Sequence, residues 1–428
     1  MTEVSAQGVA AATGVRRSRV RWWYIALPMI IVGVVNNVDR TAIGVVIANK
    51  QFLQDLNLVG KPVVLGLFMS GFMLSYALTP VLWGWAMKWC GARIAGAMGI
   101  AIWGLSMILS GLAPSANLLI AARVLLGIGE GFQHPFNFSF VTNWFPPKER
   151  SLANSMWLNG QNVGPAVAGV LMVAFIGAWG WRTAFFAIAA ISLLIPLPMV
   201  IFMMRDRPRQ HPRVNGEELR YIEEGIQAKE TEEATTEAGK SWARNYRFWL
   251  LVISWAFINL YFWGWATWMP SYFRTVRHFS FQAAGWAYSL NYVFTVVTVL
   301  GFGYLSDRVM RRAVFGVAGG IMAGIAMFLG GIVIENPYSA LIVLIIALMC
   351  QQVLFLMVSP LIQSVVPRNA IARAVGVAAL VAFLVGMLAP TFIGFLVQVS
   401  GYNAVVMFLA LSVLIAGLLI SPLVKEGY

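Results

Sequence analysis

Long apolar stretches separated by short polar loops dominate the hydrophobic pattern of this chain. A helix needs about 20 mainly apolar residues to cross the roughly 30 Å of hydrocarbon in a bilayer. Because lipid offers no hydrogen-bond partners to the backbone, such long and uniformly apolar stretches predict transmembrane helices. Twelve stretches qualify, at approximately residues 22–48, 63–87, 94–112, 116–140, 152–176, 183–204, 248–273, 281–305, 313–334, 338–365, 374–398 and 402–424. The pattern predicts an all-α membrane protein.

The sequence also repeats itself at a spacing of about 220 residues. The matching segments are Gly84-x-x-x-Lys88 with Gly303-x-x-x-Asp307, Pro147 to Arg150 with Pro367 to Arg373, and Gly180-Trp181 with Gly401-Tyr402. Three agreeing spacings predict two halves of six spans each, the arrangement expected of an alternating-access transporter. The predicted organisation is a cytoplasmic tail (1–21), an N-terminal six-helix bundle (22–204), a polar cytoplasmic linker (205–247), a C-terminal six-helix bundle (248–424) and a cytoplasmic end (425–428).

The charges support a membrane protein and give it an orientation. Hydrophobic residues make up 59% of the chain and charged residues 11%, whereas soluble domains average about 25% charged residues. The net charge is +13, but the basic residues lie in short loops, so we expect no nucleic-acid partner. Of the 30 basic residues, the predicted outer loops hold Lys50, Lys61, Arg182, Arg274 and Arg277. The positive-inside rule therefore predicts that both termini lie in the cytoplasm.

Other kinds of function find little support in the sequence. Cys90 and Cys350 are isolated, and His134, His211 and His278 match no zinc-binding spacing. No nucleophile–base constellation or sizeable extramembrane domain is present, so we predict neither an enzyme nor a metal site or cofactor.

Four charged residues lie deep inside predicted spans: Asp39, Arg40, Arg123 and Glu130. A charge at the bilayer centre costs at least ~2.5–3.5 kcal/mol, and all four fall in the N-terminal half. Arg123 and Glu130 are seven residues apart, so they share a helix face, and His134 follows one turn later.

These charges divide into two predicted roles. A carboxyl group removed from water is harder to ionise and a nearby arginine offsets this effect, so Glu130 is the first candidate for proton coupling and Asp39 the second. Arginines keep their protons, so Arg40 and Arg123 are candidates to hold a substrate carboxylate. The alternative is that Asp39–Arg123 or Arg40–Glu130 are ion pairs that only join helices. His134 is either a packing histidine or a partner that tunes Glu130.

In the C-terminal half, polar and aromatic residues near span centres are candidates to line a cavity. They are Asn259, Tyr261, Trp265, Trp268, Asn291, Tyr292, Gln351, Gln352 and Gln363. We take Tyr261, Trp265 and Asn291 as the predicted substrate contacts. The aromatic run 261–268 spreads around a helix, so most of it must face lipid or neighbouring helices.

Several motifs resemble those of a known family. The loop Gly303-x-x-x-Asp307-Arg308-x-x-Arg311-Arg312 resembles the signature of the major facilitator superfamily. Further stretches resemble its anion:cation symporter family, and together they cover the whole chain: Asn36 to Arg40, Arg123 to Asn137, Trp144 to Arg150, Gly180 to Phe185, and Arg205 to Pro212.

This resemblance implies roles for individual residues. The implied proton sites are Asp39 and Glu130. The implied substrate contacts are Arg40, Tyr76, Arg123 and Gln161, to which we add Asn37 and His134, where the chain departs from the family pattern. The implied gating residues are Gly84, Arg93, Gly303, Asp307, Arg308 and Arg312. Lys88 and Trp89 stand where the family has an aspartate and an arginine, which puts gating at that loop in question.

The combined prediction is a monomeric transporter that imports an organic carboxylate by proton symport. The family includes proton symporters for galactonate, hexuronates, glucarate, tartrate and aromatic acids. An aromatic-acid symporter therefore remains an alternative within the family. A second alternative is a proton-coupled antiporter that exports drugs or metabolites, although two membrane arginines would repel cationic cargo. The predicted partners are a small organic anion and the lipid bilayer, and the proton is the coupling ion.

Overall fold

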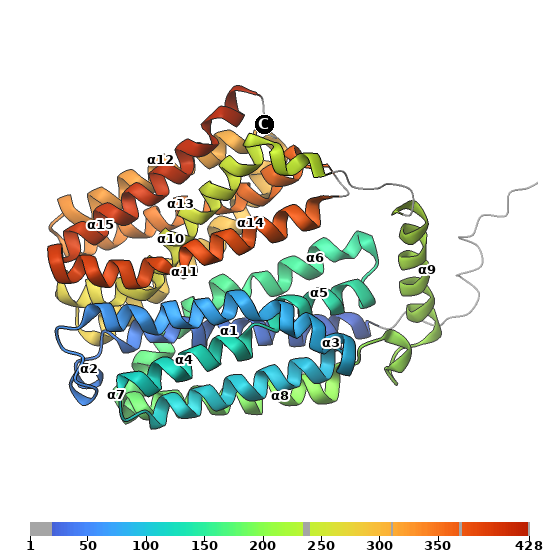
Figure 1. Cartoon of the computed structure of the whole chain (residues 1–428), viewed down its shortest axis with the longest axis horizontal. Helices are drawn as coiled ribbons and strands as arrows, with labels where there is room; N and C mark the ends of the chain where they lie inside the picture. Colours follow the sequence, from blue (N-terminus) through green and yellow to red (C-terminus); the bar gives the residue numbers. More distant parts are fainter. Residues whose placement is uncertain (1–18, 234–239, 310, 368–369, 427–428) are drawn as a thin grey trace, which may run out of the picture.

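The computed structural model describes residues 19–233, 240–309, 311–367 and 370–426. Throughout these residues the regular structure is helical. Figure 1 shows two bundles, one built from α1 to α8 and the other from α10 to α15, with helix α9 lying across one end. This architecture confirms the predicted all-α fold of two six-helix halves.

The helices follow the apolar stretches closely. The N-terminal half contains η1 (Arg21–Ala26), α1 (Leu27–Val46), α2 (Lys50–Asp55), α3 (Pro62–Leu112), α4 (Ala116–Glu130), α5 (Gln133–Trp144), α6 (Pro147–Leu158), α7 (Gly160–Leu194), α8 (Pro196–Pro198) and η2 (Met199–Met203). The linker contains η3 (Pro208–Gln210), α9 (Gly216–Glu233) and η4 (Lys240–Arg244). The C-terminal half contains α10 (Tyr246–Thr275), α11 (Phe281–Val309), α12 (Arg312–Phe328), η5 (Leu329–Val333), α13 (Pro337–Val365), α14 (Ile371–Gly386) and α15 (Leu388–Lys425).

Three glycines turn single long helices into pairs of spans. Gly91, Gly180 and Gly401 have φ angles of 82°, 81° and 74°, combined with extended ψ angles that other residues adopt only at high cost. Within the described residues, seven helical segments are long and apolar enough to cross a membrane. Three of these segments fold back at the glycines and so form two spans each, which gives ten spans. The α4–α5 pair and α11 are two further spans. The fold therefore has twelve membrane spans.

The fourth span differs from the continuous helix that the sequence predicted. It is interrupted by a turn at Gly131 and Phe132, between α4 and α5. A side chain at Gly131 would collide with Thr79, whose Oγ1 lies 2.0 Å from the position of a Cβ atom. The interruption thus lies where spans two and four pack closely, directly after Glu130.

The two halves meet at one end of the molecule, largely through glycines. A Cβ atom on Gly44 or on Gly66 would lie 2.3 Å from the carbonyl oxygen of Ala266 or Pro390, respectively, in the other half. At the same end, Arg274 donates from Nη1 to the Ala48 carbonyl at 2.5 Å. These close approaches bring backbone against backbone and seal the end of the molecule that carries α2.

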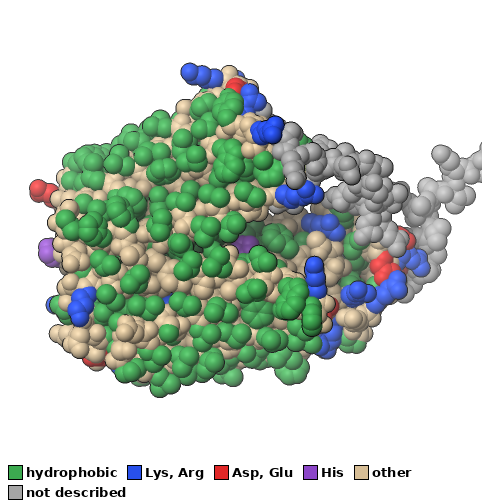
Figure 2. Space-filling view, in the orientation of Figure 1, with side chains coloured by type: hydrophobic (Ala, Val, Ile, Leu, Met, Phe, Trp, Pro, Cys, Tyr) green, Lys and Arg blue, Asp and Glu red, His purple; other side chains and the backbone are tan. Residues whose placement is uncertain are grey.

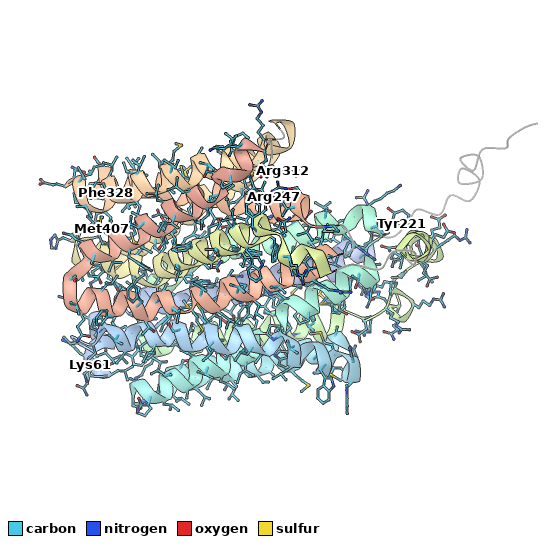
Figure 3. All side chains as sticks on the ribbon, turned by 45° about the horizontal axis from the view of Figure 1, so that its top comes forward. Lys61, Tyr221, Arg247, Arg312, Phe328 and Met407 are labelled. Atoms are coloured by element: carbon cyan, nitrogen blue, oxygen red, sulfur yellow. The ribbon has the colours of Figure 1, made fainter. Side chains whose placement is uncertain are left out.

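The halves separate toward the opposite end. In Figure 2 a recess lies between the two bundles, and a histidine side chain is visible inside it. Figure 3 places Tyr221 and Arg247 toward the end that carries the linker and Lys61 at the other end. The interior is thus closed on the α2 side and accessible from the linker side.

The linker helix α9 is attached to the N-terminal half. The Arg21 guanidinium pairs with Glu149 and with Glu218 of α9, both at 2.8 Å, and the Glu218 side chain is fully buried. Glu218 also accepts hydrogen bonds from the backbone amides of Val20 and Arg21. Tyr221 donates to Glu149 at 3.0 Å. These bonds make α9 part of the N-terminal body.

We expect Gly66→Ala to loosen the closed end, because its new methyl group would press on the Pro390 carbonyl. Overpacking of this kind costs about 1–3 kcal/mol. The measurement is maleimide labelling of a single cysteine at Thr391, in a background without Cys90 and Cys350, and labelling should rise several-fold. Gly177→Ala is the matched control, because no atom lies within 4 Å of its Cβ position. Equal labelling of both variants would show that the glycine contact does not seal this end.

Candidate functional site

The centre of the N-terminal half holds a buried ion pair between Arg40 and Glu130. Arg40 donates from Nη2 and Nε to Glu130 Oε2, at 3.0 Å and 3.2 Å, and a further bond runs from Nη2 to Asn36 Oδ1 at 2.8 Å. The two paired side chains are 3% and 0% exposed. One of the two ion pairs that the sequence suggested is therefore present. It connects the first span to the fourth.

Asp39, although adjacent in sequence, is held by a different set of partners. Its Oδ2 atom accepts hydrogen bonds from Trp103 Nε1 and from Ser192 Oγ, the latter at 3.1 Å. These partners belong to α3 and α7. The carboxylate of Asp39 is thus engaged with the third and sixth spans, whereas Arg40 interacts with the fourth.

Arg123 binds backbone carbonyls in place of the carboxylate of Asp39. Its guanidinium donates to the carbonyl oxygens of Phe68 at 3.4 Å, Asp39 at 3.4 Å and Arg40 at 3.3 Å. The suggested Asp39–Arg123 ion pair is absent among the described residues. In this conformation Arg123 joins three spans and adds a fixed positive charge behind the Arg40–Glu130 pair.

Tyr76 and His134 connect the ion pair to the recess. The Arg40 guanidinium carbon lies 4.3 Å from the centre of the Tyr76 ring, a distance typical of a cation–π contact. The Tyr76 hydroxyl is 3.0 Å from His134 Nδ1. His134 is partly exposed and packs edge-on against Trp157, with ring centres 5.4 Å apart. His134 therefore contacts Tyr76, which in turn contacts Arg40.

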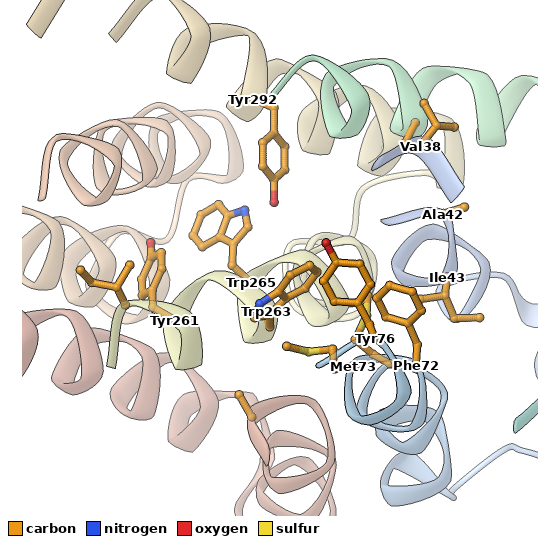
Figure 4. Close-up of a cluster of buried hydrophobic side chains, with 14 of the residues drawn as sticks. Val38, Ala42, Ile43, Phe72, Met73, Tyr76, Tyr261, Trp263, Trp265 and Tyr292 are labelled. Atoms are coloured by element: carbon orange, nitrogen blue, oxygen red, sulfur yellow. The ribbon is translucent and has the colours of Figure 1, made fainter. Parts of the chain in front are cut away.

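The C-terminal half presents aromatic side chains to this cluster. Figure 4 shows Trp263 beside Tyr76 of α3, with Trp265 and Tyr292 close to Trp263 and with Tyr261 farther away, beyond Trp265. Tyr261 is stacked on Trp265, with ring centres 5.7 Å apart, and the Trp263 ring lies 5.9 Å from the Arg40 guanidinium. The indole nitrogen of Trp265 is buried and has no hydrogen-bond partner among the described residues. The wall is thus mainly apolar, with a few unpaired polar atoms.

Three other predicted contacts lie in different surroundings. Asn37 donates to the Gly33 carbonyl and Asn291 to the Ala287 carbonyl, each within its own helix. Gln161 is partly exposed on α7. The following residue, Asn162, reaches the other half, where its Oδ1 accepts from Gln352 Nε2 at 3.3 Å and from Thr295 Oγ1 at 3.5 Å.

Sequence reasoning missed Asn162 and Trp263. The polar amide of Asn162 in the middle of an apolar span could have identified this residue from the sequence. The family resemblance pointed instead to the neighbouring Gln161. Trp263 lies in an aromatic run whose helical phase was not fixed by the sequence.

A family model described as Major Facilitator Superfamily matches residues 29–390 and 284–427. The chain belongs to the Major Facilitator Superfamily. Its fold resembles that of a bacterial homolog of the human lysosomal transporter Spinster, crystallised in an inward-facing and occupied conformation. The TM-score is 0.80 at 19% sequence identity, over 96% of this chain and 98% of that one.

Relatives within the superfamily carry organic anions according to their names. A probable sulfoacetate transporter of Cupriavidus necator is 32% identical, over 58% of this chain and 57% of its own. A probable L-galactonate transporter of Escherichia coli is 24% identical, over 67% and 61%. This chain therefore spans less than two thirds of the length of either relative. A probable galactarate/D-glucarate transporter of Escherichia coli is 25% identical over 92% of both chains. These relatives confirm the resemblance of this chain to anion transporters.

The turn between the second and third spans, predicted as the first gating loop, is held by an acidic residue from the end of the sixth span. Asp206, from the end of the sixth span, accepts a hydrogen bond from the Arg93 backbone amide at 2.8 Å. Its carboxylate fills the space beside Gly91, within 2.5 Å of where a Cβ would lie. Lys88 is exposed. Asp206 thus anchors the turn in which Lys88 replaces the family's aspartate.

The remaining predicted gating residues contribute less to the described structure. No atom lies within 4 Å of a Cβ position at Gly84. Arg312 begins α12, and the side chains of Gly303, Asp307 and Arg308 lie outside the described part of the chain.

We expect Arg40→Ala to destabilise the protein strongly, because it leaves Glu130 buried without its partner. Removal of one member of a buried ion pair costs about 3–5 kcal/mol. The double variant Arg40→Ala/Glu130→Gln should recover much of that loss, because the amide is uncharged. Thermal unfolding in detergent measures both effects. A double variant no more stable than Arg40→Ala would mean that the pair is not the source of the loss.

Proposed function

We propose that this transporter imports an organic carboxylate together with protons, by alternating access, across the inner membrane and with both termini in the cytoplasm. Under this proposal the recess on the linker side faces the cytoplasm. The protein acts as a monomer, and the proton is its coupling ion.

The observation that carries the proposal is the pairing of Arg40 with Glu130. A guanidinium keeps its charge under all physiological conditions, so Arg40 always needs an anionic or polar partner in this buried site. In the present conformation that partner is Glu130. When Glu130 takes up a proton, Arg40 loses its anionic partner and becomes available to a carboxylate of the substrate. The proton and the anion then enter the site together.

The proposed cycle follows from this competition. From the outer side, protonation of Glu130 precedes binding of the anion to Arg40, and the charge in the cavity stays balanced. The two halves then rock and open the linker side. Loss of the proton into the cytoplasm restores the Glu130 carboxylate, which displaces the substrate from Arg40. Asp39 is a second candidate to carry a proton, at a site bounded by Trp103 and Ser192.

The chemical class of substrate is supported by the relatives and by the cavity wall. The three relatives are named for sulfoacetate, galactonate, and galactarate or glucarate, all of which are organic acids. Arg40 suits a carboxylate in each of them. The aromatic wall of Tyr261, Trp263 and Trp265 favours a second candidate, an aromatic acid whose ring would pack there. Export of lipophilic cations fits less well, because Arg40 and Arg123 are fixed positive charges.

The test uses purified protein in liposomes that contain a pH-sensitive dye. The acids to be added outside are sulfoacetate, galactonate, glucuronate, glucarate, tartrate, hydroxybenzoate and phthalate. We expect one or more to drive proton uptake in the wild type. Glu130→Gln should abolish proton uptake, because its amide cannot ionise, and should still exchange labelled substrate for unlabelled substrate.

Two results would contradict this proposal. An Asp39→Asn/Glu130→Gln protein that still concentrates substrate against a gradient would remove both carboxyl groups from coupling. Proton exit on addition of a lipophilic amine, with no response to any acid, would indicate the antiporter instead.

A further inference from the structure

Asn137 on α5 is an unusual residue for the interior of a membrane protein. Its side chain is fully buried, and neither Oδ1 nor Nδ2 has a hydrogen-bond partner among the described residues. Buried polar side chains are nearly always satisfied by protein atoms or by bound water. A buried donor or acceptor left unsatisfied costs about 1–3 kcal/mol, so an amide with neither atom paired is expensive to keep. A packing role alone does not account for it.

The position of Asn137 relates it to the ion pair. Gly131 and Phe132, the two residues between α4 and α5, keep right-handed helical φ/ψ angles of −59°/−14° and −67°/−24°. Arg123, Glu130 and Asn137, which follow one another at steps of seven residues, therefore stay close to one face of the fourth span across the turn. Asn137 is roughly 10 Å from Glu130 along the helix axis, from the rise of 1.5 Å per residue, on the side toward the linker. Glu130 itself has one oxygen, Oε1, that is buried without a partner. Two unsatisfied polar groups therefore lie in succession between the ion pair and the inner end.

The alternative route from Glu130 toward the inner side runs past a positive charge. The guanidinium of Arg40 bonds the other oxygen of Glu130 and lies against Tyr76 and Trp263, toward the C-terminal half. A proton that left Glu130 directly into the space between the halves would have to pass this fixed cation. Charges of like sign repel strongly at short distance inside a protein.

We propose that Asn137 is a positioning residue for proton release: its amide binds water that connects Glu130 to the inner end of the N-terminal half. The Glu130 carboxyl group gives its proton to this water, which passes a proton on toward the cytoplasm. The carboxylate left behind pairs with Arg40 and displaces the substrate. The proton path then runs inside the N-terminal half, and the substrate path runs between the halves. This inference rests on the proposed proton symport.

The test replaces Asn137 with leucine, which has a similar shape but binds no water. In liposomes we expect net substrate uptake and proton uptake to fall at least tenfold. Exchange of labelled for unlabelled substrate should change less than twofold, with the same KM, because exchange requires no net proton release. The midpoint of thermal unfolding should stay equal or rise, because leucine fills the same space and leaves no buried polar atom that needs a partner. Asn137→Ser, which can still bind water, should restore much of the net uptake.

A matched control is Ser254→Ala, because the Ser254 hydroxyl is equally buried but bonds the Ala416 carbonyl. It should leave both modes of transport unchanged. If Asn137→Leu lowers exchange and net uptake equally, or lowers thermal stability, Asn137 is a packing residue and the inference is wrong. It is also wrong if the variant couples protons normally. If the wild type itself takes up no protons with any acid, the proposed symport fails as well, so the two failures are distinguishable.

Discussion

A guanidinium group enclosed in a membrane protein cannot be neutralised, and the arrangement of this transporter follows from that constraint. Arg40 cannot give up its proton, and its side chain is almost completely shielded from solvent. Its surroundings must therefore supply compensation in every state of the transport cycle. Here Glu130, Asn36 and the face of Tyr76 supply it together. The site contains one permanent cation, Arg40, and one carboxylate, Glu130, whose charge disappears when it binds a proton. These two groups are the minimum needed for the arginine to exchange its internal partner for an anion from outside.

The proposed cycle requires that both sides of the membrane reach this pair in turn, and the rest of the fold bears on how they could. The glycines at the closed end let the two halves approach backbone to backbone, and side-chain hydrogen bonds from Ser70 and Arg274 also join the halves there. The N-terminal half carries the membrane charges, whereas the C-terminal half contributes an aromatic wall and a few unpaired polar atoms. This division means that charge compensation remains inside one rigid body while the halves move. The ion pair does not have to break merely because the molecule changes conformation.

The sequence predicted the spans, the two halves and the four membrane charges, because each depends on local composition or spacing. It could not predict which charges would meet. Asp39 and Arg40 are neighbours, and their side chains leave α1 in different directions, so one reaches Trp103 and the other Glu130. The turn after Glu130 depends on close packing against Thr79, which no local pattern reveals. The unpaired state of Asn137 became visible only from its tertiary surroundings, because an asparagine in a span looks the same in the sequence whether its amide is hydrogen-bonded or not.

The linker adds a mechanical consequence to this picture. Arg21 holds α9 through Glu218 and holds the start of α6 through Glu149, so the linker helix is tied to the N-terminal half. If α9 moves with that half, its N-terminal end does not take up the adjustment between the halves. A linker that was free at both ends would only limit how far the halves can separate. A linker that is fixed at its N-terminal side keeps α9 in one place relative to the N-terminal half, which carries the membrane charges. That place is the end of the half where the proposed proton path emerges. In the proposed mechanism the substrate leaves between the halves and the proton leaves through one half, so α9 remains beside the proton exit while the substrate exit opens and closes.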